Sequence, residues 1–379
     1  MNVTIAKSDL IRAITNVQDV AEKKGKFEAL THVLITASAG SLAACATDLE
    51  TWASASVPAE TTEPGSIALP PKYWLAWLKL LPEGPVQIQT GGRAHLDTAR
   101  VLAGAEEIVL NGISGDNFPQ APAQEGTLEK FEVRGGTLTQ LIGQTAYAMS
   151  DDEAGRPGQC AALLEGTPGI LRVVTTDGHR LAKCEMDVAA QQRDLTVLVP
   201  RHGILALQRL ARRQILTREP QTSIAISATH FFASAPGEWV AIKTLDVSLF
   251  PPYRMVMPDA PQQIAHINRA DFARALKMCL AAKARHDTVT LEVSAEAIRV
   301  VARNAADEPL ASAAVARSSR DAAVDLAIKT NGRYLLDAVN ALRGNPEVAL
   351  GFSGPLDACT VQLPADVGTS RAVALVASV

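Results

Sequence analysis

Ten residues near the middle of the chain hold many of its reactive side chains. The stretch TTDGHRLAKC, residues 175–184, contains an Asp, a His, an Arg, a thiol and two hydroxyls. A carboxylate that orients an imidazole beside a hydroxyl is the arrangement of a hydrolase, so Asp177, His179 and a nearby hydroxyl are candidates for nucleophilic catalysis. The remaining sequence offers no support for an enzyme, because it contains no P-loop, G-x-S-x-G or H-E-x-x-H motif.

The same ten residues also have a structural interpretation. Asp-Gly is a favoured pair in tight turns, and residues 177–178 lie between two strand-like runs. Comparable turns recur at residues 46–51 (ATDLET) and 302–307 (ARNAAD), and neither contains a His. Catalysis needs an oriented base and a substrate pocket, so the recurrence favours a turn over an active site.

Composition narrows the class of protein. The chain has 379 residues, 47% of them hydrophobic and 20% charged, which is enough for a sizeable core and two or three domains. The first ten residues lack the apolar core of a secretion signal, and no run of ~20 apolar residues follows, which predicts a cytoplasmic protein. The five cysteines are widely spaced without a C-x-x-C pair, so we expect no disulfide framework, metal site or cofactor.

A long repeat organises the whole chain. Helix-compatible segments with leucines at helical spacing begin near Tyr73, His202 and Asn331, and these residues are separated by 129 positions in both cases. The polar turns described above keep the same phase, and another helix-compatible segment opens each repeat. Each repeat is therefore expected to contain a helix, alternating strands, a second helix and further strands.

This order of elements predicts an α+β architecture in which helices cover one face of antiparallel sheet. Pro-rich stretches at residues 116–126 and 249–263 mark the junctions between repeats. We therefore predict three domains of one design, at residues 1–125, 126–252 and 253–379.

Positive charge is concentrated in the predicted helices. These segments contain 18 Lys or Arg and 5 Asp or Glu, although the formal net charge of the chain is −4. Glu forms helices as readily as Lys, so the imbalance indicates a helical surface that attracts a polyanion. With 4% aromatic residues and no zinc-finger or RNP signature, we expect contacts to phosphates rather than to bases. The segments are residues 7–26, 70–81, 136–148, 200–216, 269–285 and 330–343.

Several motifs, taken with the repeat and the basic helices, resemble the bacterial DNA polymerase III beta subunit, the sliding clamp family. The resemblance extends over essentially the whole chain, keeps the motifs in order, and is most specific in TTDGHRLA. The motifs are ATDLE (46–50), TTDGHRLA (175–182), VPRHG (199–203), FPPYRMVMP (250–258) and YLLDAVNAL (334–342).

The resemblance implies a non-catalytic accessory subunit of a DNA polymerase holoenzyme. Three DNA-clamp (processivity-fold) domains per chain would form a head-to-tail homodimer of pseudo-sixfold symmetry, with helices lining a ring around double-stranded DNA and antiparallel sheets outside. Its implied partners are the DNA polymerase III alpha subunit, the clamp loader and other clients with clamp-binding motifs. These clients bind through a peptide cleft between the second and third domains, and no membrane is involved.

The family's peptide cleft can be carried over residue by residue. The turn matches at Thr176, Gly178, His179, Arg180 and Leu181, and the following junction matches at Pro251 and Val256. A buried structural role for His179 is the alternative.

Three departures from the family predict a reshaped cleft. Gln159 stands where an apolar wall residue is common, and Met255 where an Arg is frequent. The tail, which includes Leu375, ends ALVASV instead of showing Met-Pro-Met-Arg-Leu character. A specialised second clamp, or a clamp-like DNA-binding scaffold with an altered client set that does not serve the main replicase, is the alternative function.

The DNA-binding and dimer residues are predicted on two grounds. The resemblance carries over Lys24, Lys72, Arg156 and Arg201 as DNA contacts. Helix charge alone adds Lys79, Arg209, Arg213, Arg274 and Lys277. An approximate alignment places an apolar dimer patch around Met278, Cys279 and Leu280.

Overall fold

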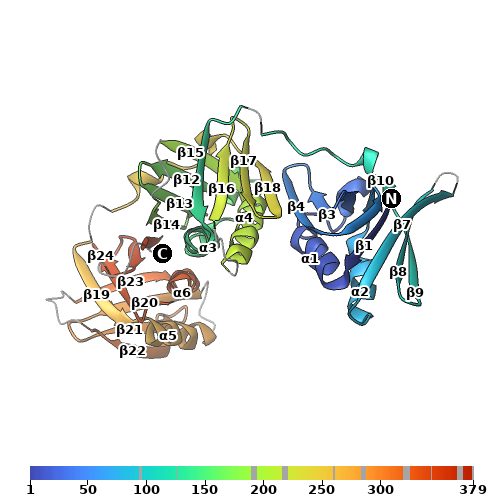
Figure 1. Ribbon diagram of the computed structural model, residues 1–379. Helices are drawn as coiled ribbons and strands as arrows, with labels where there is room; N and C mark the ends of the chain where they lie inside the picture. Colours follow the sequence, from blue (N-terminus) through green and yellow to red (C-terminus); the bar gives the residue numbers. More distant parts are fainter. Residues whose placement is uncertain are drawn as a thin grey trace. The chain divides into compact units, whose positions relative to one another are not determined.

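The computed structural model describes residues 1–93, 96–124, 126–188, 194–215, 221–258, 261–282, 287–318, 325–342, 344–364 and 370–377. The chain forms two compact units, one from Met1–Gly136 and His202–Thr244, the other from Thr137–Arg201 and Leu245–Val379. Each unit combines two antiparallel sheets with α-helices, so the predicted α+β class is confirmed (Figure 1).

The first unit contains a five-stranded and a nine-stranded sheet. In the five-stranded sheet the order is β5-β1-β7-β8-β9, with β1 Asn2–Ala6, β5 Glu60–Glu63, β7 Pro85–Arg93, β8 Leu96–Ala103 and β9 Glu106–Asn111. In the nine-stranded sheet the order is β10-β6-β2-β3-β4-β18-β17-β16-β11. Its strands are β2 Val33–Ser38, β3 Ser41–Thr47, β4 Thr51–Pro58, β6 Gly65–Leu69, β10 Ile113–Ser114, β11 Glu129–Arg134, β16 Gln221–Ile226, β17 His230–Ala235 and β18 Glu238–Lys243.

The second unit contains an eight-stranded and a four-stranded sheet. In the eight-stranded sheet the order is β15-β12-β13-β14-β26-β25-β24-β19. Its strands are β12 Ala161–Thr167, β13 Ile170–Thr176, β14 Arg180–Asp187, β15 Leu195–Pro200, β19 Gln263–Asn268, β24 Glu347–Phe352, β25 Cys359–Gln362 and β26 Ser370–Val376. The four-stranded order is β22-β21-β20-β23, with β20 Thr288–Val293, β21 Ala297–Arg303, β22 Pro309–Ala316 and β23 Leu326–Asn331.

Two strand pairings join segments that are distant in sequence. Strand β4 pairs with β18, with Ala53 opposite Val240, and β14 pairs with β26, with Leu181 opposite Leu375. Both pairings are antiparallel, so backbone hydrogen bonds run across the junctions of the predicted domains. Each long sheet is therefore shared by two of the three repeats.

The helices begin where the sequence supplies suitable caps. Pro71 opens α2 with a preset backbone angle, and Asn268 and Asn331 accept hydrogen bonds from the first backbone amides of α5 and α6. The helices are α1 Lys7–Val17, α2 Pro71–Leu80, α3 Gly135–Gly143, α4 Arg201–Gln214, α5 Arg269–Ala281 and α6 Gly332–Ala341. Short 3-10 turns are η1 Glu28–Thr31, η2 Gly115–Asn117, η3 Ala146–Ala148, η4 Pro157–Cys160, η5 Val247–Leu249 and η6 Tyr253–Met255.

Two predicted helices are shorter than expected. The segment 7–26 was predicted as one helix, but α1 ends at Val17, and the mostly polar run that follows has one buried large apolar residue, Val20, and includes Gly25. Helix α3 ends at Gly143, and just beyond it the Thr145 hydroxyl donates a hydrogen bond to the carbonyl of Leu141. The 3-10 turn η3 replaces the last turn of the predicted helix. The ends predicted at residues 216, 283–285 and 343 lie outside the described residues.

Candidate functional site

The stretch that resembles an active site forms a tight turn between β13 and β14. The Asp177 carboxylate accepts hydrogen bonds from the backbone amides of His179 and Arg180 at 2.9 and 3.0 Å. Thr176 donates its hydroxyl hydrogen to the carbonyl of Arg180 at 2.7 Å and accepts from the amide of Gly178 at 3.1 Å. Gly178 has a φ of +89°, which favours a residue without a Cβ. The polar groups of the turn are thus used to hold its shape.

His179 does not have the partners of a catalytic base. Its side chain is exposed, and in the described part of the chain no group is hydrogen-bonded to its ring. The second carboxylate oxygen of Asp177 accepts from Arg180 Nε at 2.9 Å instead of orienting the imidazole. The alternative of a buried structural histidine is therefore wrong, and the catalytic interpretation has no geometric support.

Arg180 links the turn to helix α6. Its Nη1 donates to Asp337 Oδ2 at 2.7 Å, and its guanidinium lies over the ring of Tyr334 at 4.4 Å and near that of Tyr147 at 5.5 Å. Burial opposes the charge of Arg180, but Asp337 and Asp177 outweigh burial and raise its pKa above the ordinary value. The Arg180 guanidinium is therefore held in place by two carboxylates and two aromatic rings.

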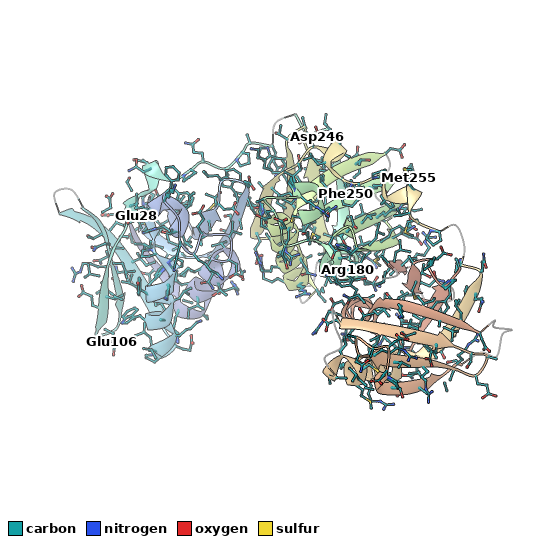
Figure 2. All side chains as sticks on the ribbon, turned by 180° about the vertical axis from the view of Figure 1, so that it is seen from behind. Glu28, Glu106, Arg180, Asp246, Phe250 and Met255 are labelled. Carbon is teal, nitrogen blue, oxygen red and sulfur yellow. The ribbon has the colours of Figure 1, made fainter. Side chains whose placement is uncertain are left out.

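A hydrophobic cluster lies beneath the turn. The side chains of Leu181 and Leu375 are only 3% and 8% exposed, so they form its interior and not an open wall. Phe250, which is labelled in Figure 2, and Tyr253 belong to the cluster and lie in the linker that follows η5. The cluster consists of Ala161, Leu163, Val174, Leu181, Leu198, Phe250, Tyr253 and Leu375, with Leu245, Met257 and Ala358 packed against it.

A row of alternating charges crosses the sheet beside this cluster. Glu165, Arg172, Glu185 and Arg371 are neighbours on successive strands β12, β13, β14 and β26. Arg172 Nη1 donates to Glu165 Oε2 at 3.0 Å, and its Nε donates to Glu185 Oε2 at 2.7 Å. Opposite charges on facing residues stabilise strand pairs, so the row supports the pairing of β14 with β26.

Glu165 also anchors the linker. Tyr253 Oη donates to Glu165 Oε2 at 2.6 Å, and Arg254 Nη2 donates to Oε1 at 2.8 Å. Burial alone would raise the pKa of Glu165, but the hydrogen bonds from Tyr253 and Arg172 and the charge of Arg254 hold it below the ordinary value.

The exposed residues around the turn define what is here called the turn-linker surface. It comprises the exposed parts of Arg156, Gln159, Gly178, His179, Pro251, Met255 and Val256. A Cβ on Gly178 would lie 3.3 Å from both Arg156 Nη1 and Gln159 Nε2, so η4 approaches the turn closely. The amide of Ala377 donates to the carbonyl of His179 at 3.1 Å, which brings the end of β26 to the same place. The predicted tail residues 378 and 379 lie outside the described residues.

The nine predicted DNA-binding cations differ in their surroundings. Lys24, Lys72, Lys79, Arg156 and Lys277 are exposed and form no ion pair within the described part of the chain. The other four have carboxylate neighbours, namely Arg201 with Asp151 at 2.9 Å, Arg209 with Asp19 at 3.7 Å, Arg213 with Glu238 at 2.6 Å and Arg274 with Asp271 at 3.1 Å. The first five can offer their charge to a phosphate without breaking an ion pair.

Charge segregation persists in the observed helices, in modified form. The six described α-helices contain twelve Lys or Arg and three Asp or Glu. Lys23, Lys24 and Lys26, which were counted as helical, lie in the loop after α1, and Lys7 is buried against the carbonyl of Leu81. Part of the positive charge predicted for the helices is therefore carried by the loop after α1.

Sequence reasoning missed two groups near the predicted cations. Arg212 is exposed in the last turn of α4. It lies four residues after the buried Gln208, so helical spacing alone did not predict that its side chain is exposed. Phe27 is 69% exposed directly after Lys26, and an exposed aromatic side chain gives no signal in a single sequence.

The predicted dimer patch is only partly a surface. Met278 is 50% exposed on α5 and Leu280 is half-buried, whereas Cys279 is fully buried and donates from Sγ to the carbonyl of Val300 at 3.2 Å. Cys279 is therefore a core residue, because successive helix positions face different directions. Helix α2 presents two large exposed side chains, Tyr73 and Leu80.

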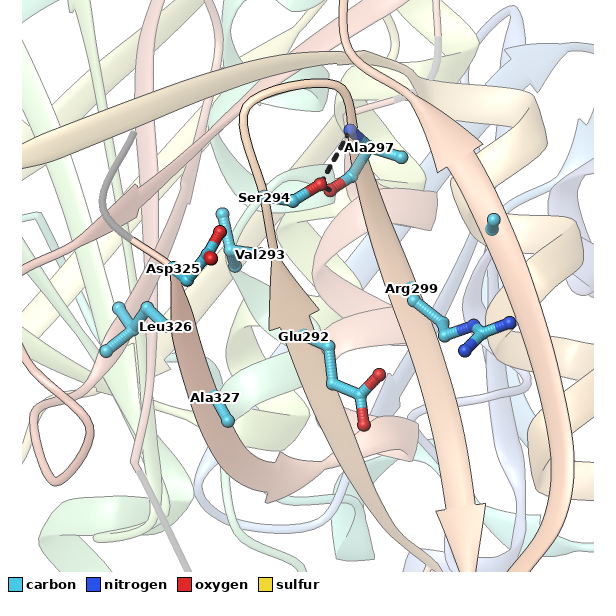
Figure 3. Close-up of a pocket in the computed structure, with 9 residues that line it drawn as sticks. Glu292, Val293, Ser294, Ala297, Arg299, Asp325, Leu326 and Ala327 are labelled. Carbon is cyan, nitrogen blue, oxygen red and sulfur yellow. Dashed lines mark hydrogen bonds between the residues drawn. The ribbon is translucent and has the colours of Figure 1, made fainter. Parts of the chain in front are cut away.

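A shallow pocket lies elsewhere, on the four-stranded sheet (Figure 3). Glu292 and Arg299 face each other across β20 and β21, and short Ala314 and Ala327 flank them on the outer strands, which leaves the hollow. In the described ranges, no group of three or more His, Cys, Asp or Glu could hold a metal ion. No helix among the described residues has the length and apolar character to cross a bilayer.

The chain matches three consecutive protein families. Residues 1–122 match the DNA polymerase III beta subunit, N-terminal domain, residues 132–251 its central domain, and residues 254–376 its C-terminal domain. Two curated relatives named beta sliding clamp are 28% identical to the chain. The protein from Pseudomonas aeruginosa aligns over 90% of both chains, and that from Caulobacter vibrioides over 97% of both.

Solved structures agree with these matches. A sliding clamp from Pseudomonas aeruginosa bound to griselimycin superposes with a TM-score of 0.90 at 26% identity, covering 100% of this chain and 99% of that one. The C. crescentus beta sliding clamp gives a TM-score of 0.88 at 25% identity, covering 100% and 98%. The repeat, the shared sheets and the turn at residues 176–181 are all accounted for by these matches. The chain belongs to the DNA polymerase III beta subunit family of sliding clamps.

Proposed function

We propose that the protein is a replication processivity factor that encircles duplex DNA and tethers DNA polymerase to it. The observation that carries this proposal is the succession of three beta-subunit domain matches, which together span nearly the whole chain. Relatives named beta sliding clamp align over 90% or more of this chain. A specialised clamp-like scaffold is not favoured, because the matches include all three domains.

DNA is proposed to be held by topology and by phosphate contacts. Lys24, Lys72, Lys79, Arg156 and Lys277, which form no ion pair with any described residue, supply positive charge, and Arg201, Arg209, Arg213 and Arg274 join them in the proposed interface. Contacts of this kind carry no base information, so the protein can slide. The chain itself has no catalytic role in this function.

The proposed assembly is a head-to-tail homodimer. Such a contact is heterologous and closes after two copies when the third domain of one chain meets the first domain of the other. Exposed apolar residues occur on both elements that would meet, Met278 on α5 beside the half-buried Leu280, and Tyr73 and Leu80 on α2. A dimer built on these faces gives a ring of six domains.

Clients are proposed to bind the turn-linker surface through a short peptide. The DNA polymerase III alpha subunit and the clamp loader are the proposed clients, and the cytoplasm is the proposed location. Val256 and Pro251 offer apolar contact, and the turn offers backbone groups near Gly178. Burial of two or three client side chains at ~1.5 to 3 kcal/mol each, less the cost of ordering the peptide, corresponds to micromolar affinity.

Retention on DNA of different topology tests the proposal. The protein is loaded by a bacterial clamp loader onto a nicked circular plasmid, half of which is then linearised, and bound protein is separated by gel filtration. We expect retention on the circle and loss from the linear form. Equal retention on both would indicate ordinary adhesive binding, and a monomeric mass in light scattering at micromolar concentration would contradict the ring.

A further inference from the structure

The loop that follows α1 exposes an aromatic ring next to several lysines. Phe27 is 69% exposed, and Lys23, Lys24 and Lys26 just before it are exposed and form no ion pair with a described residue. A lone apolar side chain on a surface needs no explanation. An aromatic ring that lies among cations, however, has the composition of surfaces that bind single-stranded nucleic acid.

Backbone hydrogen bonds close the loop at its base. The amide of Glu22 donates to the carbonyl of Leu30 at 2.9 Å, and the amide of Leu30 donates to the carbonyl of Phe27 at 3.2 Å. Val20 and Leu30, on either side of the loop, are 8% and 3% exposed and fix its ends in the core. The ring is therefore presented from an ordered backbone, which lowers the entropy lost on binding.

Two carboxylates accompany the lysines and lie at the two ends of the loop. Glu22 takes part in the closing hydrogen bond, and Glu28, labelled in Figure 2, begins η1 directly after Phe27. Residues 22–28 contain three lysines and two glutamates, a net charge of +1, and the lysines occupy the middle of the loop. Cations for phosphates and a ring for a base are thus combined in one short segment.

The repeat relates Phe27 to a predicted DNA contact. Phe27 and Arg156 are 129 positions apart, which is the repeat spacing, and each directly precedes a 3-10 turn, η1 in the first repeat and η4 in the second. Arg156 is one of the cations proposed to contact phosphates. The first repeat therefore offers an aromatic ring at the position where the second offers a positive charge.

We propose that Phe27 stacks on an unpaired base of the DNA, so that the protein binds gapped DNA more tightly than continuous duplex. The inference rests on the proposed function, because it adds a single-strand contact to the proposed phosphate contacts. Bases in a duplex are stacked on both faces, so a side chain must separate them before it can insert. An unpaired base carries no such cost and leaves a face free for the ring. Phe27 therefore leaves sliding on duplex unhindered and slows the protein at a gap.

Titrations with paired and gapped DNA test the preference. One fluorescent duplex is continuous, and the other has the same length and a short gap of unpaired nucleotides. We expect the unaltered protein to bind the gapped DNA at least about fivefold more tightly, the ratio for one stacked base. In Phe27→Ala this ratio should fall to about one, and Phe27→Leu, which keeps an apolar side chain without a ring, should behave alike. Phe27→Trp should retain the preference.

A fluorescent adenine analogue in the gap reports stacking directly. Its emission should be quenched by the unaltered protein and by Phe27→Trp, but not by Phe27→Ala. Lys24→Ala is the matched control in the same loop, and it should weaken binding to both DNAs by a similar factor, because a phosphate contact does not depend on base pairing. Melting temperatures of all variants report on folding.

The outcomes separate this contact from the proposed function. Equal binding of both DNAs by the unaltered protein, or a ratio unaffected by Phe27→Ala, would overturn the stacking contact even if the protein is retained on nicked circles. A variant Phe27→Ala that keeps the ratio but is loaded poorly by the clamp loader would show that the ring contacts a protein, which also overturns the inference. Loss of the unaltered protein from nicked circles would contradict the proposed function itself.

Discussion

Arg180 and Asp337 form a 2.7 Å hydrogen-bonded ion pair that joins the turn of the central domain to helix α6 of the C-terminal domain. The Arg180 side chain is 13% exposed and that of Asp337 36%, so the pair is only partly screened by water. The turn proposed to bind clients is therefore mechanically connected to the next domain through one guanidinium.

The contribution of this pair can be measured by a double-mutant cycle. Arg180→Ala leaves two carboxylates without their shared cation, and we expect a loss of about 2–4 kcal/mol in the free energy of unfolding. Asp337→Ala should cost less, about 1–2 kcal/mol, because Asp177 still pairs with Arg180. Urea unfolding of both single variants and the double variant gives the coupling energy, and strictly additive losses would contradict the pair.

Acid should weaken the charged row beside the cluster. Glu165 and Glu185 have pKa values held below the ordinary value, so their contribution to stability is present above the unfolded pKa near 4.5 and is lost as the pH falls through the folded pKa. Urea midpoints measured between pH 6 and pH 3 should fall less steeply in Glu165→Gln than in the unaltered protein. Parallel pH dependences would show that Glu165 is not a source of the acid sensitivity.

Removal of exposed cations that have no ion pair among the described residues should lower the salt dependence of DNA binding. A triple variant with Lys24, Lys72 and Arg156 changed to Ala should reduce the slope of log K against log salt by up to ~0.9 per lost phosphate contact. A matched triple variant changes Arg100, Arg303 and Arg371, which are paired on strands. Titration of duplex DNA at several salt concentrations compares the two variants. Equal slopes would show that Lys24, Lys72 and Arg156 do not contact the DNA.

Charge on either proposed dimer face should produce monomers. We expect Met278→Asp and Leu80→Asp each to halve the mass in light scattering at micromolar concentration, because the partner face would bury an unpaired carboxylate. Both side chains are at least half exposed, so the monomer should remain folded. Leu128→Asp is the control at a similarly exposed site, and a full dimer mass for the first two variants would exclude these faces.

Client binding and stability should separate at two residues of the turn-linker region. Leu181→Ala opens a cavity in the buried cluster and should cost about 2–4 kcal/mol of unfolding free energy. Val256→Asp, at a 59% exposed position, should abolish peptide binding with little change in stability. Calorimetric titration with one client peptide measures binding, and thermal unfolding measures stability, for both variants. Unaltered binding by Val256→Asp would show that clients bind at another site.

Local chemistry made much of the fold predictable. The Asp-Gly turn at residues 177–178 and the helix entry at Asn331 each act over a few residues, so they are visible in the sequence. The 129-residue spacing is visible because the same local patterns recur. The end of α1 at Val17 was missed because Lys and Glu suit a helix and a solvated loop equally well.

Features that depend on distant pairings could not be predicted in the same way. Leu181 and Leu375 are interior residues because β14 pairs with β26, and an alternating strand pattern does not say which of its faces another segment will cover. Arg213 differs from Lys24 in having an ion pair, and its partner Glu238 lies on another element, β18. The sequence alone did not predict this pair.

The seam between β14 and β26 has a consequence for synthesis. Its residues Asp187 and Arg371 are 184 positions apart, so at ~5–20 residues per second the ribosome needs about 10–40 s to make the second strand after the first. During that interval β14 is an open sheet edge above an incomplete apolar cluster, a surface prone to association with other chains. The nascent protein is thus expected to need chaperone protection until its last strand emerges.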